Sequence, residues 1–171
     1  MFNASQFKLI RIIVILVALA AILFKFTSGI SAMNKIKDEG ADLLLKLRPA
    51  DPRALMLGDY MALAYDRQIY PDNDAAALPA GTIILKRDSR NVGRFERFDD
   101  GEPLTAGEIR IAYARRFAGD VDYGGARYFF EEGQAKIFED AEYGIFKVSA
   151  DGKALLTGLA GEDYARLGQK R

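Results

Sequence analysis

Carboxylates, lysines, serines and tyrosines are the residues with which this chain could perform chemistry, because its 171 residues include no histidine and no cysteine. Ser-His-Asp and Cys-His catalysis, disulfide bonds and zinc sites built on these residues are therefore excluded. A hydrolytic reaction would need a Ser-Lys pair or two carboxylates instead. The sequence also contains no cofactor motif, so we predict no cofactor and no metal centre.

The acidic residues do not form a recognisable catalytic pair. Glu131 and Glu132 are adjacent in the sequence. Acid–base catalysis would require a second carboxylate across the substrate, such as Asp59 or Glu108. Sequence spacing does not bring any of these acids together, and solvated or ion-paired acids are far commoner than catalytic ones.

Other candidate groups are equally weak. Ser89 follows Lys86 by three residues, a spacing that directs the two side chains to opposite faces of a strand. Asp72-Asn73-Asp74 and Asp120-x-Asp122 offer oxygen ligands, but they lack the ligand number and the fixed glycine of a calcium loop. We therefore predict no catalytic residues and favour a protein without enzyme activity.

The strongest candidate site begins at Arg53 and continues through Gly58-Asp59-Tyr60 to Leu63 and Tyr65. Gly58 permits a tight turn that Asp59 can cap through backbone N–H groups, and Arg53 can pair with a nearby aspartate. The tyrosines either bury their rings with a satisfied hydroxyl or contact a ligand. We predict that this segment binds a partner together with a second group of residues, Tyr128, Glu132 and Gly133.

The apolar pattern after residue 40 predicts a mainly β, partly barrel-like domain. Residues 108–115 alternate cleanly, whereas the leucine-rich residues 42–48 suit either a strand buried on both faces or a helix turn. Apolar residues spaced by three in 92–98 are explained by a bulge near Gly93. Further strands are predicted at 60–65, 82–87, 126–130, 143–148 and 153–159, with a hairpin turn at 150–152 and a short helix at 134–141.

Residues 1–32 are predicted to be an anchor. Residues 12–24 form an uncharged run of 13, and the long side chains of the flanking Arg11 and Lys25 can reach the membrane interfaces. A spanning signal-anchor is favoured; a signal peptide cleaved near residue 32 and a buried core helix are the alternatives. Residues 33–48 are then a stalk helix, which Gly40 ends, and a first strand, and residues 49–171 are the folded domain.

The charges differ between these two parts of the chain. The first 32 residues contain three cations and no acid, whereas residues 33–171 carry 21 Lys and Arg against 24 Asp and Glu. Without a basic excess the domain cannot neutralise phosphates, so we predict no nucleic-acid binding. Cations on both sides of the apolar run nearly balance the positive-inside rule, but the short N-terminal tail favours the N-terminus inside and the domain outside.

The spacing Gly58-Asp59-Tyr60-x-x-Leu63-x-Tyr65 after Pro52-Arg53, with Tyr128-Phe-Phe-x-Glu132-Gly133 downstream, resembles the GDYXXLXY protein family from about residue 35 to residue 159. This is a bacterial family of membrane-anchored proteins. The resemblance implies an extracytoplasmic domain, often encoded beside multi-pass membrane proteins, and no particular activity.

A second resemblance is to the layout of type I signal peptidases. Residues 50–59 are similar to the block that carries their nucleophile, but Ala50 stands at the serine position. Arg94 and Arg97 are the basic residues where the general-base lysine belongs, and a guanidinium stays protonated at physiological pH. Ala141 replaces the serine of the last block. This resemblance implies a peptidase-like fold without peptidase chemistry.

Taken together, these patterns predict a single-pass protein of the inner (cytoplasmic) membrane with an extracytoplasmic C-terminal domain. The predicted function is a non-catalytic interaction domain that binds a neighbouring integral membrane protein. The alternative is a membrane-surface hydrolase, either signal-peptidase-like or based on carboxylates.

Overall fold

The computed structural model describes residues 4–48, 60–70, 79–116 and 120–168. The chain divides into two compact units, Met1–Lys35 and Ile36–Arg171. The first consists of most of an apolar helix, and the second contains all the described strands and the described buried core.

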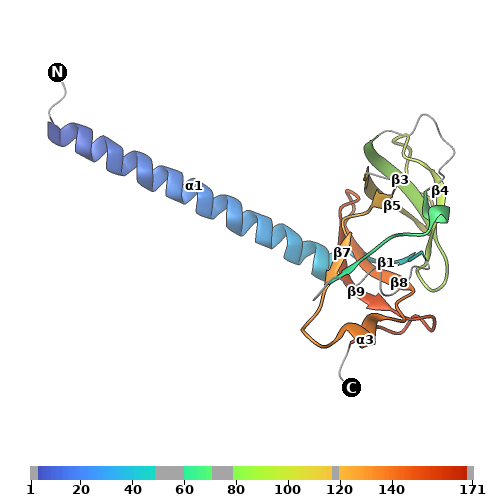
Figure 1. Cartoon of the computed structure of the whole chain (residues 1–171). Helices are drawn as coiled ribbons and strands as arrows, with labels where there is room; N and C mark the ends of the chain where they lie inside the picture. The colour runs from blue at the N-terminus through green and yellow to red at the C-terminus, as the bar shows by residue number, and fades with distance from the viewer. Residues whose placement is uncertain (1–3, 49–59, 71–78, 117–119, 169–171) are drawn as a thin grey trace. The chain divides into compact units, whose positions relative to one another are not determined.

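The N-terminal helix α1 is continuous over Ala4–Glu39, so residues 31–39 extend the anchor helix rather than forming a separate one (Figure 1). Its stretch Arg11–Glu39 is long and apolar enough to cross a membrane, and an 18-residue window within it has a mean hydropathy of 2.4. Gly40 ends the helix as predicted, and its N–H donates to the Ile36 carbonyl at 2.9 Å. A Cβ at this position would lie 2.3 Å from the same oxygen, so lack of space requires the glycine.

The described residues of the larger unit form three antiparallel sheets. A three-stranded sheet has the order β1-β8-β9, a four-stranded sheet the order β4-β3-β5-β6, and a two-stranded ribbon pairs β2 with β7. Their bounds are β1 Ala41–Lys46, β2 Tyr60–Ala62, β3 Ala80–Arg87, β4 Gly93–Phe98, β5 Glu108–Arg115, β6 Val121–Asp122, β7 Arg127–Phe129, β8 Tyr143–Val148 and β9 Ala154–Ala160.

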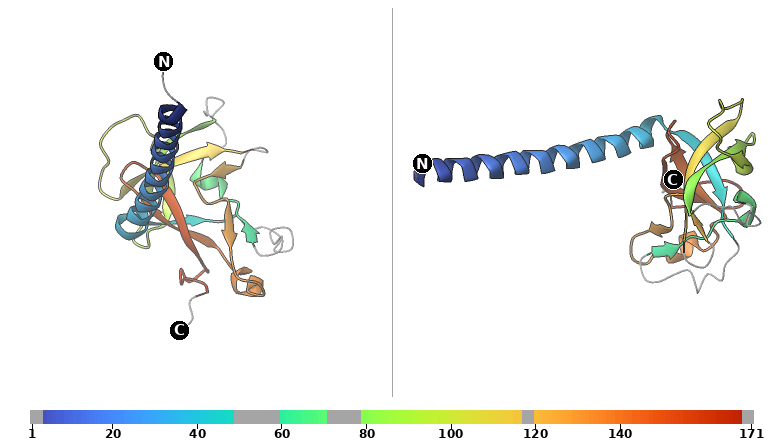
Figure 2. Two further views of the ribbon diagram at one scale, coloured as in Figure 1. Left: turned by 90° about the vertical axis from the view of Figure 1, so that its left-hand side faces the viewer. Right: turned by 90° about the horizontal axis from the view of Figure 1, so that it is seen from above.

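The prediction of a mainly β domain behind an N-terminal helix is confirmed. The sheets are open, and within the described ranges none closes on itself as a barrel (Figure 2). The leucine-rich segment forms the strand β1, in which Leu43, Leu44 and Leu45 are all buried, so both faces of this strand are covered. The hairpin turn between β8 and β9 is confirmed, with Gly152 at a φ of 86°.

The position of the predicted bulge was wrong. Ile84 pairs with Arg97 and Leu85 with Phe95, so the extra residue of β4 is Glu96. Gly93 serves another purpose, since a Cβ there would lie 2.8 Å from the Leu43 side chain. This glycine therefore lets β4 approach the core closely.

Two short helical turns complete the described fold. The 3-10 helix η1 covers Arg67–Ile69, and Asp66 caps it by accepting the N–H of Gln68 at 2.9 Å. The short helix predicted at 134–141 is confirmed as α3, but it covers only Ala135–Phe138. Phe138 is buried and attaches this turn to the core.

Candidate functional site

The second half of the Gly-Asp-Tyr segment alternates strictly between buried and half-buried positions. Met61, Leu63 and Tyr65 are buried, whereas Tyr60 and its neighbours at 62 and 64 are partly exposed. This is the period of an extended chain, whose successive side chains point to opposite sides. Leu63 and Tyr65 of the predicted site therefore belong to the core, and Tyr60 belongs to the surface.

This segment connects two of the sheets. Tyr60 pairs with Phe129 and Met61 with Tyr128 in the β2–β7 ribbon, so the strands that carry Tyr60 and Tyr128 of the predicted site lie side by side. Further along, the Arg48 N–H donates to the Ala64 carbonyl at 2.8 Å, and Leu47 forms an antiparallel bridge with Tyr65. The segment thus leaves the ribbon and continues the edge of the β1 sheet.

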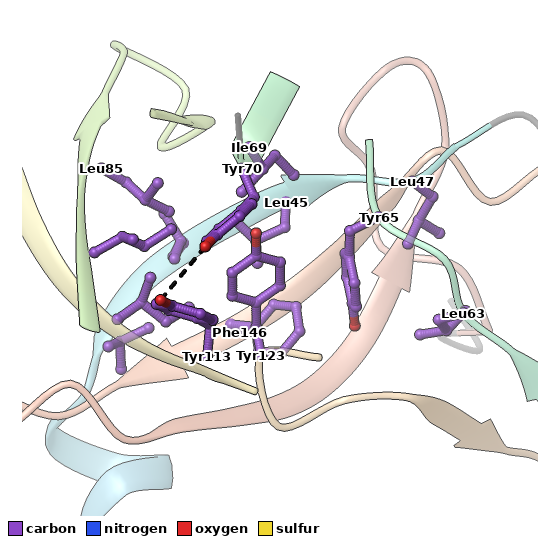
Figure 3. Packing of buried hydrophobic residues seen from close by; sticks show 14 of the residues in the cluster. Leu45, Leu47, Leu63, Tyr65, Ile69, Tyr70, Leu85, Tyr113, Tyr123 and Phe146 are labelled. Carbon is purple, nitrogen blue, oxygen red and sulfur yellow. Dashed lines mark hydrogen bonds between the residues drawn. The ribbon is translucent and has the colours of Figure 1, made fainter. Parts of the chain in front are cut away.

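Tyr65 anchors this segment on the inner side. Its hydroxyl donates to the carbonyl of Gly125, and its ring packs 5.3 Å from Tyr123 and 5.8 Å from Phe146, measured between centroids (Figure 3). Burial raises the pKa of the Tyr65 hydroxyl above its usual value. The group therefore stays protonated at physiological pH, and its geometry suits a structural role.

Gly125 makes this contact possible. A Cβ at this position would lie 2.9 Å from the Leu156 Cβ and 2.9 Å from the Phe146 ring. The backbone preceding β7 can therefore pass close to β8 and β9 only without a side chain. Asp122 shapes the same turn by accepting the N–H groups of Gly124 and Gly125 at 2.9 and 3.0 Å.

The outer side of the ribbon carries an aromatic patch, which we define as Tyr60, Arg127 and Phe129. The Phe129 side chain is 69% exposed, and its ring lies 5.6 Å from that of Tyr60. The Arg127 guanidinium carbon lies 5.4 Å from the centre of the Tyr60 ring, within the range of a cation–π contact. Two rings and a cation are thus presented together to the surroundings.

The remaining predicted site residues lie beside this patch or in the turn that follows it. Tyr128 faces inward and packs edge-on against Phe138 with the ring centroids 5.1 Å apart. Glu132 is exposed, and Gly133 has a φ of 81° with open space around it, so conformation rather than room requires this glycine. Arg53, Gly58 and Asp59 lie outside the described residues.

A cleft of about 470 Å³ lies along the same segment. Its lining combines two cations, Lys46 and Arg48, with four acidic residues, Glu139, Asp140, Glu142 and Glu162, beside residues 61–64. Arg48 is also tied to Asp120 through an ion pair of 2.5 Å. The cleft therefore offers carboxylates next to the candidate motif.

Three of the acidic and lysine side chains that were considered and set aside as catalytic candidates are engaged locally. The Thr105 N–H and the Arg97 guanidinium hold the pKa of Glu108 below its usual value. Glu131 accepts a hydrogen bond from the Gln134 amide at 2.7 Å, and the Lys86 ammonium donates to the Ala106 carbonyl at 2.7 Å. Within the described residues, no group of three or more carboxylates is placed to bind a metal.

Sequence reasoning missed Arg127 and Phe129. A signal was present, because three aromatic residues in succession, Tyr128-Phe129-Phe130, cannot all face inward from one strand. Tyr128 and Phe130 pack against Phe138, so Phe129 is the one directed outward. The pairing with Tyr60 then depends on the tertiary register.

The fold and this segment define a mainly β domain preceded by a helix that is long and apolar enough to span a membrane. The chain belongs to the GDYXXLXY protein family, whose model matches residues 22–159. The family resemblance is thus confirmed, and the match begins within α1. A search of curated proteins and a search of solved structures each returned no match. The resemblance to signal peptidases stays a prediction, and its Ala50 lies outside the described residues.

Proposed function

We propose that this protein is a membrane-anchored interaction domain without catalytic activity, which binds a neighbouring integral membrane protein. The observation that carries the proposal is the aromatic patch of Tyr60, Arg127 and Phe129 on the outer side of the β2–β7 ribbon. Tyrosine, phenylalanine and arginine are the residue types enriched in protein interfaces. Because the Phe129 residue is 69% exposed, a partner that covers its ring would remove a large apolar surface from water, which favours binding.

The construction of the ribbon supports this role. Leu63 and Tyr65 hold the motif segment in the core, and Tyr128 does the same for β7 by packing against Phe138. Surface groups on a fixed scaffold lose little conformational entropy on binding. The patch is therefore well organised for contact with a partner.

The location that we propose is the inner membrane, with the N-terminus inside and the domain outside. The apolar helix supports single-pass anchoring. The short N-terminal tail and the family resemblance support this orientation. An integral membrane protein is the natural partner, because both molecules would be confined to the same surface.

A pull-down of the full-length protein from mild detergent tests the proposal. We expect a specific membrane protein with the wild type and at least about tenfold less of it with Tyr60→Ala/Phe129→Ala, since a tenfold loss of affinity is about 1.4 kcal/mol and hot-spot truncations cost about 2 kcal/mol or more. Leu104→Ala is the matched control, because Leu104 is also exposed but lies outside the patch. Equal recovery with the double variant, or no partner with the wild type in repeated trials, would contradict the proposal.

A carboxylate-based hydrolase is the second candidate, and the cleft is the observation in its favour. Four acids line it beside the motif segment. Hydrolysis of a soluble ester, glycoside or peptide by the full-length protein, abolished by Glu142→Gln but not by Glu102→Gln outside the cleft, would support this alternative. An unchanged rate in the Glu142→Gln variant would exclude this residue from the chemistry.

A further inference from the structure

One side of α1 combines a notch with a charge. Ile22, Phe26, Ile30 and Met33 recur at helical spacing, with Lys25 and Gly29 between them; we call this side the Gly29 face. A shallow groove of about 620 Å³ is lined by these six residues and Asn34. A Cβ built at Gly29 meets nothing within 4 Å, so the notch is open.

Lys25 is the unusual member of this face. It is the only charged residue between positions 12 and 34. A helix crosses the hydrocarbon core with about 20 residues, so a span that begins at Ile12 places Lys25 roughly 9 Å inside its C-terminal end. Side chains on a helix tilt toward its N-terminus, so this ammonium is directed away from the nearer interface.

A different placement of the span in the membrane leaves other side chains of the Gly29 face in an unfavourable environment. A span of residues 9–26 would bring Lys25 to the interface, but Ile30 and Met33 would then lie beyond the hydrocarbon. These side chains are 59% and 55% exposed, and they lie on the Gly29 face. In either placement the same face carries groups that need a covering partner.

The neighbouring hydroxyl groups, unlike the Lys25 ammonium, form hydrogen bonds within the helix. Thr27 donates to the Leu23 carbonyl at 2.9 Å, and Ser28 donates to the Lys25 carbonyl at 3.0 Å, so both are satisfied within the helix. Within the described ranges no hydrogen bond or ion pair involves the Lys25 ammonium. When Lys25 lies within the hydrocarbon, its counter-charge therefore comes from another molecule.

We infer that the Gly29 face docks a transmembrane helix of a different protein, which carries an Asp or Glu opposite Lys25. Charge complementarity selects this occupant. The first acid of the chain is Asp38, so a second copy would bring only Lys25 to the contact. The open notch at Gly29 admits close approach of the two helices. This inference rests on the proposed function and adds a second contact, in the membrane, to that of the aromatic patch.

The test is photo-crosslinking of the full-length protein in native membranes. We expect a probe at Phe26, on the Gly29 face, to form an adduct with an apolar helix that contains Asp or Glu, as identified by mass spectrometry. A probe at Phe24, on another side of α1, should not form it. Lys25→Met should lower the yield about fivefold to tenfold, and Lys25→Glu with the partner's acid changed to Lys should restore it.

A matched pair of variants examines the notch. Gly29→Leu should lower the yield, whereas Ala20→Leu should not, because Ala20 lies about two and a half turns before Gly29 and therefore on the opposite side. Any of three outcomes would overturn the inference: equal yields from both probes, adducts only with lipid or with a second copy, or no effect of Lys25→Met. If Lys25→Met retains a partner that Tyr60→Ala/Phe129→Ala loses, the proposed function stands and the Gly29 face does not bind it. If the wild type captures no partner by either method, both fail.

Discussion

The two sides of the segment Tyr60–Tyr65 differ in almost every property. On the inner side, Leu63 and Tyr65 are each 7% exposed and lie in the core cluster. On the outer side, Tyr60 is half-buried and contacts the exposed Phe129 and the Arg127 guanidinium. One motif therefore serves two purposes, because side chains two positions apart on a strand point to the same side and side chains three positions apart point to opposite sides.

The opposing strand β7 repeats this division. Tyr128 points inward to Phe138, and Phe129 points outward to Tyr60. A substitution on the inner side should therefore change stability, and one on the outer side should change recognition. Each of the following variants tests one part of this comparison.

The largest effect is expected for Tyr65→Ala. Removal of a buried ring that contacts Tyr123 and Phe146 should lower the free energy of unfolding by about 3–5 kcal/mol, through lost burial and the cavity left behind. Tyr60→Ala should cost about 1 kcal/mol or less, the worth of a cross-strand pair. Urea unfolding of the two variants measures the difference, and similar losses would refute the division into two sides.

Gly125→Ala should have an intermediate effect. Its methyl group would lie 2.9 Å from Leu156 and Phe146, so repacking should cost about 1–3 kcal/mol. Gly161→Ala is the control, because the nearest atom to its Cβ would be at an ordinary 3.5 Å, and we expect a change within about 0.5 kcal/mol. Thermal unfolding of both variants decides whether close approach beneath the ribbon is the constraint.

The smallest effect is expected for Tyr65→Phe, which leaves the ring and removes the hydrogen bond to Gly125. We expect a loss of about 1 kcal/mol at neutral pH. The matched variant is Tyr123→Phe, because the buried Tyr123 hydroxyl has no hydrogen-bond partner among the described residues; this change should be neutral or stabilising. Equal destabilisation of the two variants would show that the bond does not matter.

The same pair should differ from the wild type at alkaline pH. Burial raises the pKa of both hydroxyls above the usual value of 10.0. The folded state then retains protons that the unfolded chain releases. The contribution of these hydroxyls to the free energy of unfolding is therefore complete below about pH 10 and is lost as the pH rises toward the folded pKa. Between pH 9 and 11, the free energy of unfolding should decrease less steeply with pH for each Phe variant than for the wild type. A slope equal to that of the wild type would contradict the assigned burial.

Much of the fold could be predicted because it depends on local pattern. Alternation in Glu108–Arg115, the glycine of the β8–β9 turn and the leucine run of β1 each reflect the side-chain period or a φ requirement. The anchor was equally clear, since length and hydropathy are properties of a contiguous segment. The bulge was misplaced because it depends on which residue of β3 lies opposite.

The candidate site likewise combines features that the sequence determines with features that the tertiary structure determines. The sequence by itself determined that His and Cys chemistry is absent, that an apolar helix precedes a β domain, and that the Gly-Asp-Tyr spacing marks the family. Only the tertiary structure decided that Tyr65 bonds to Gly125 and that Tyr60 meets Phe129 and Arg127. These contacts join residues more than 50 positions apart, and the pairing of separate strands, rather than any local preference, sets their register.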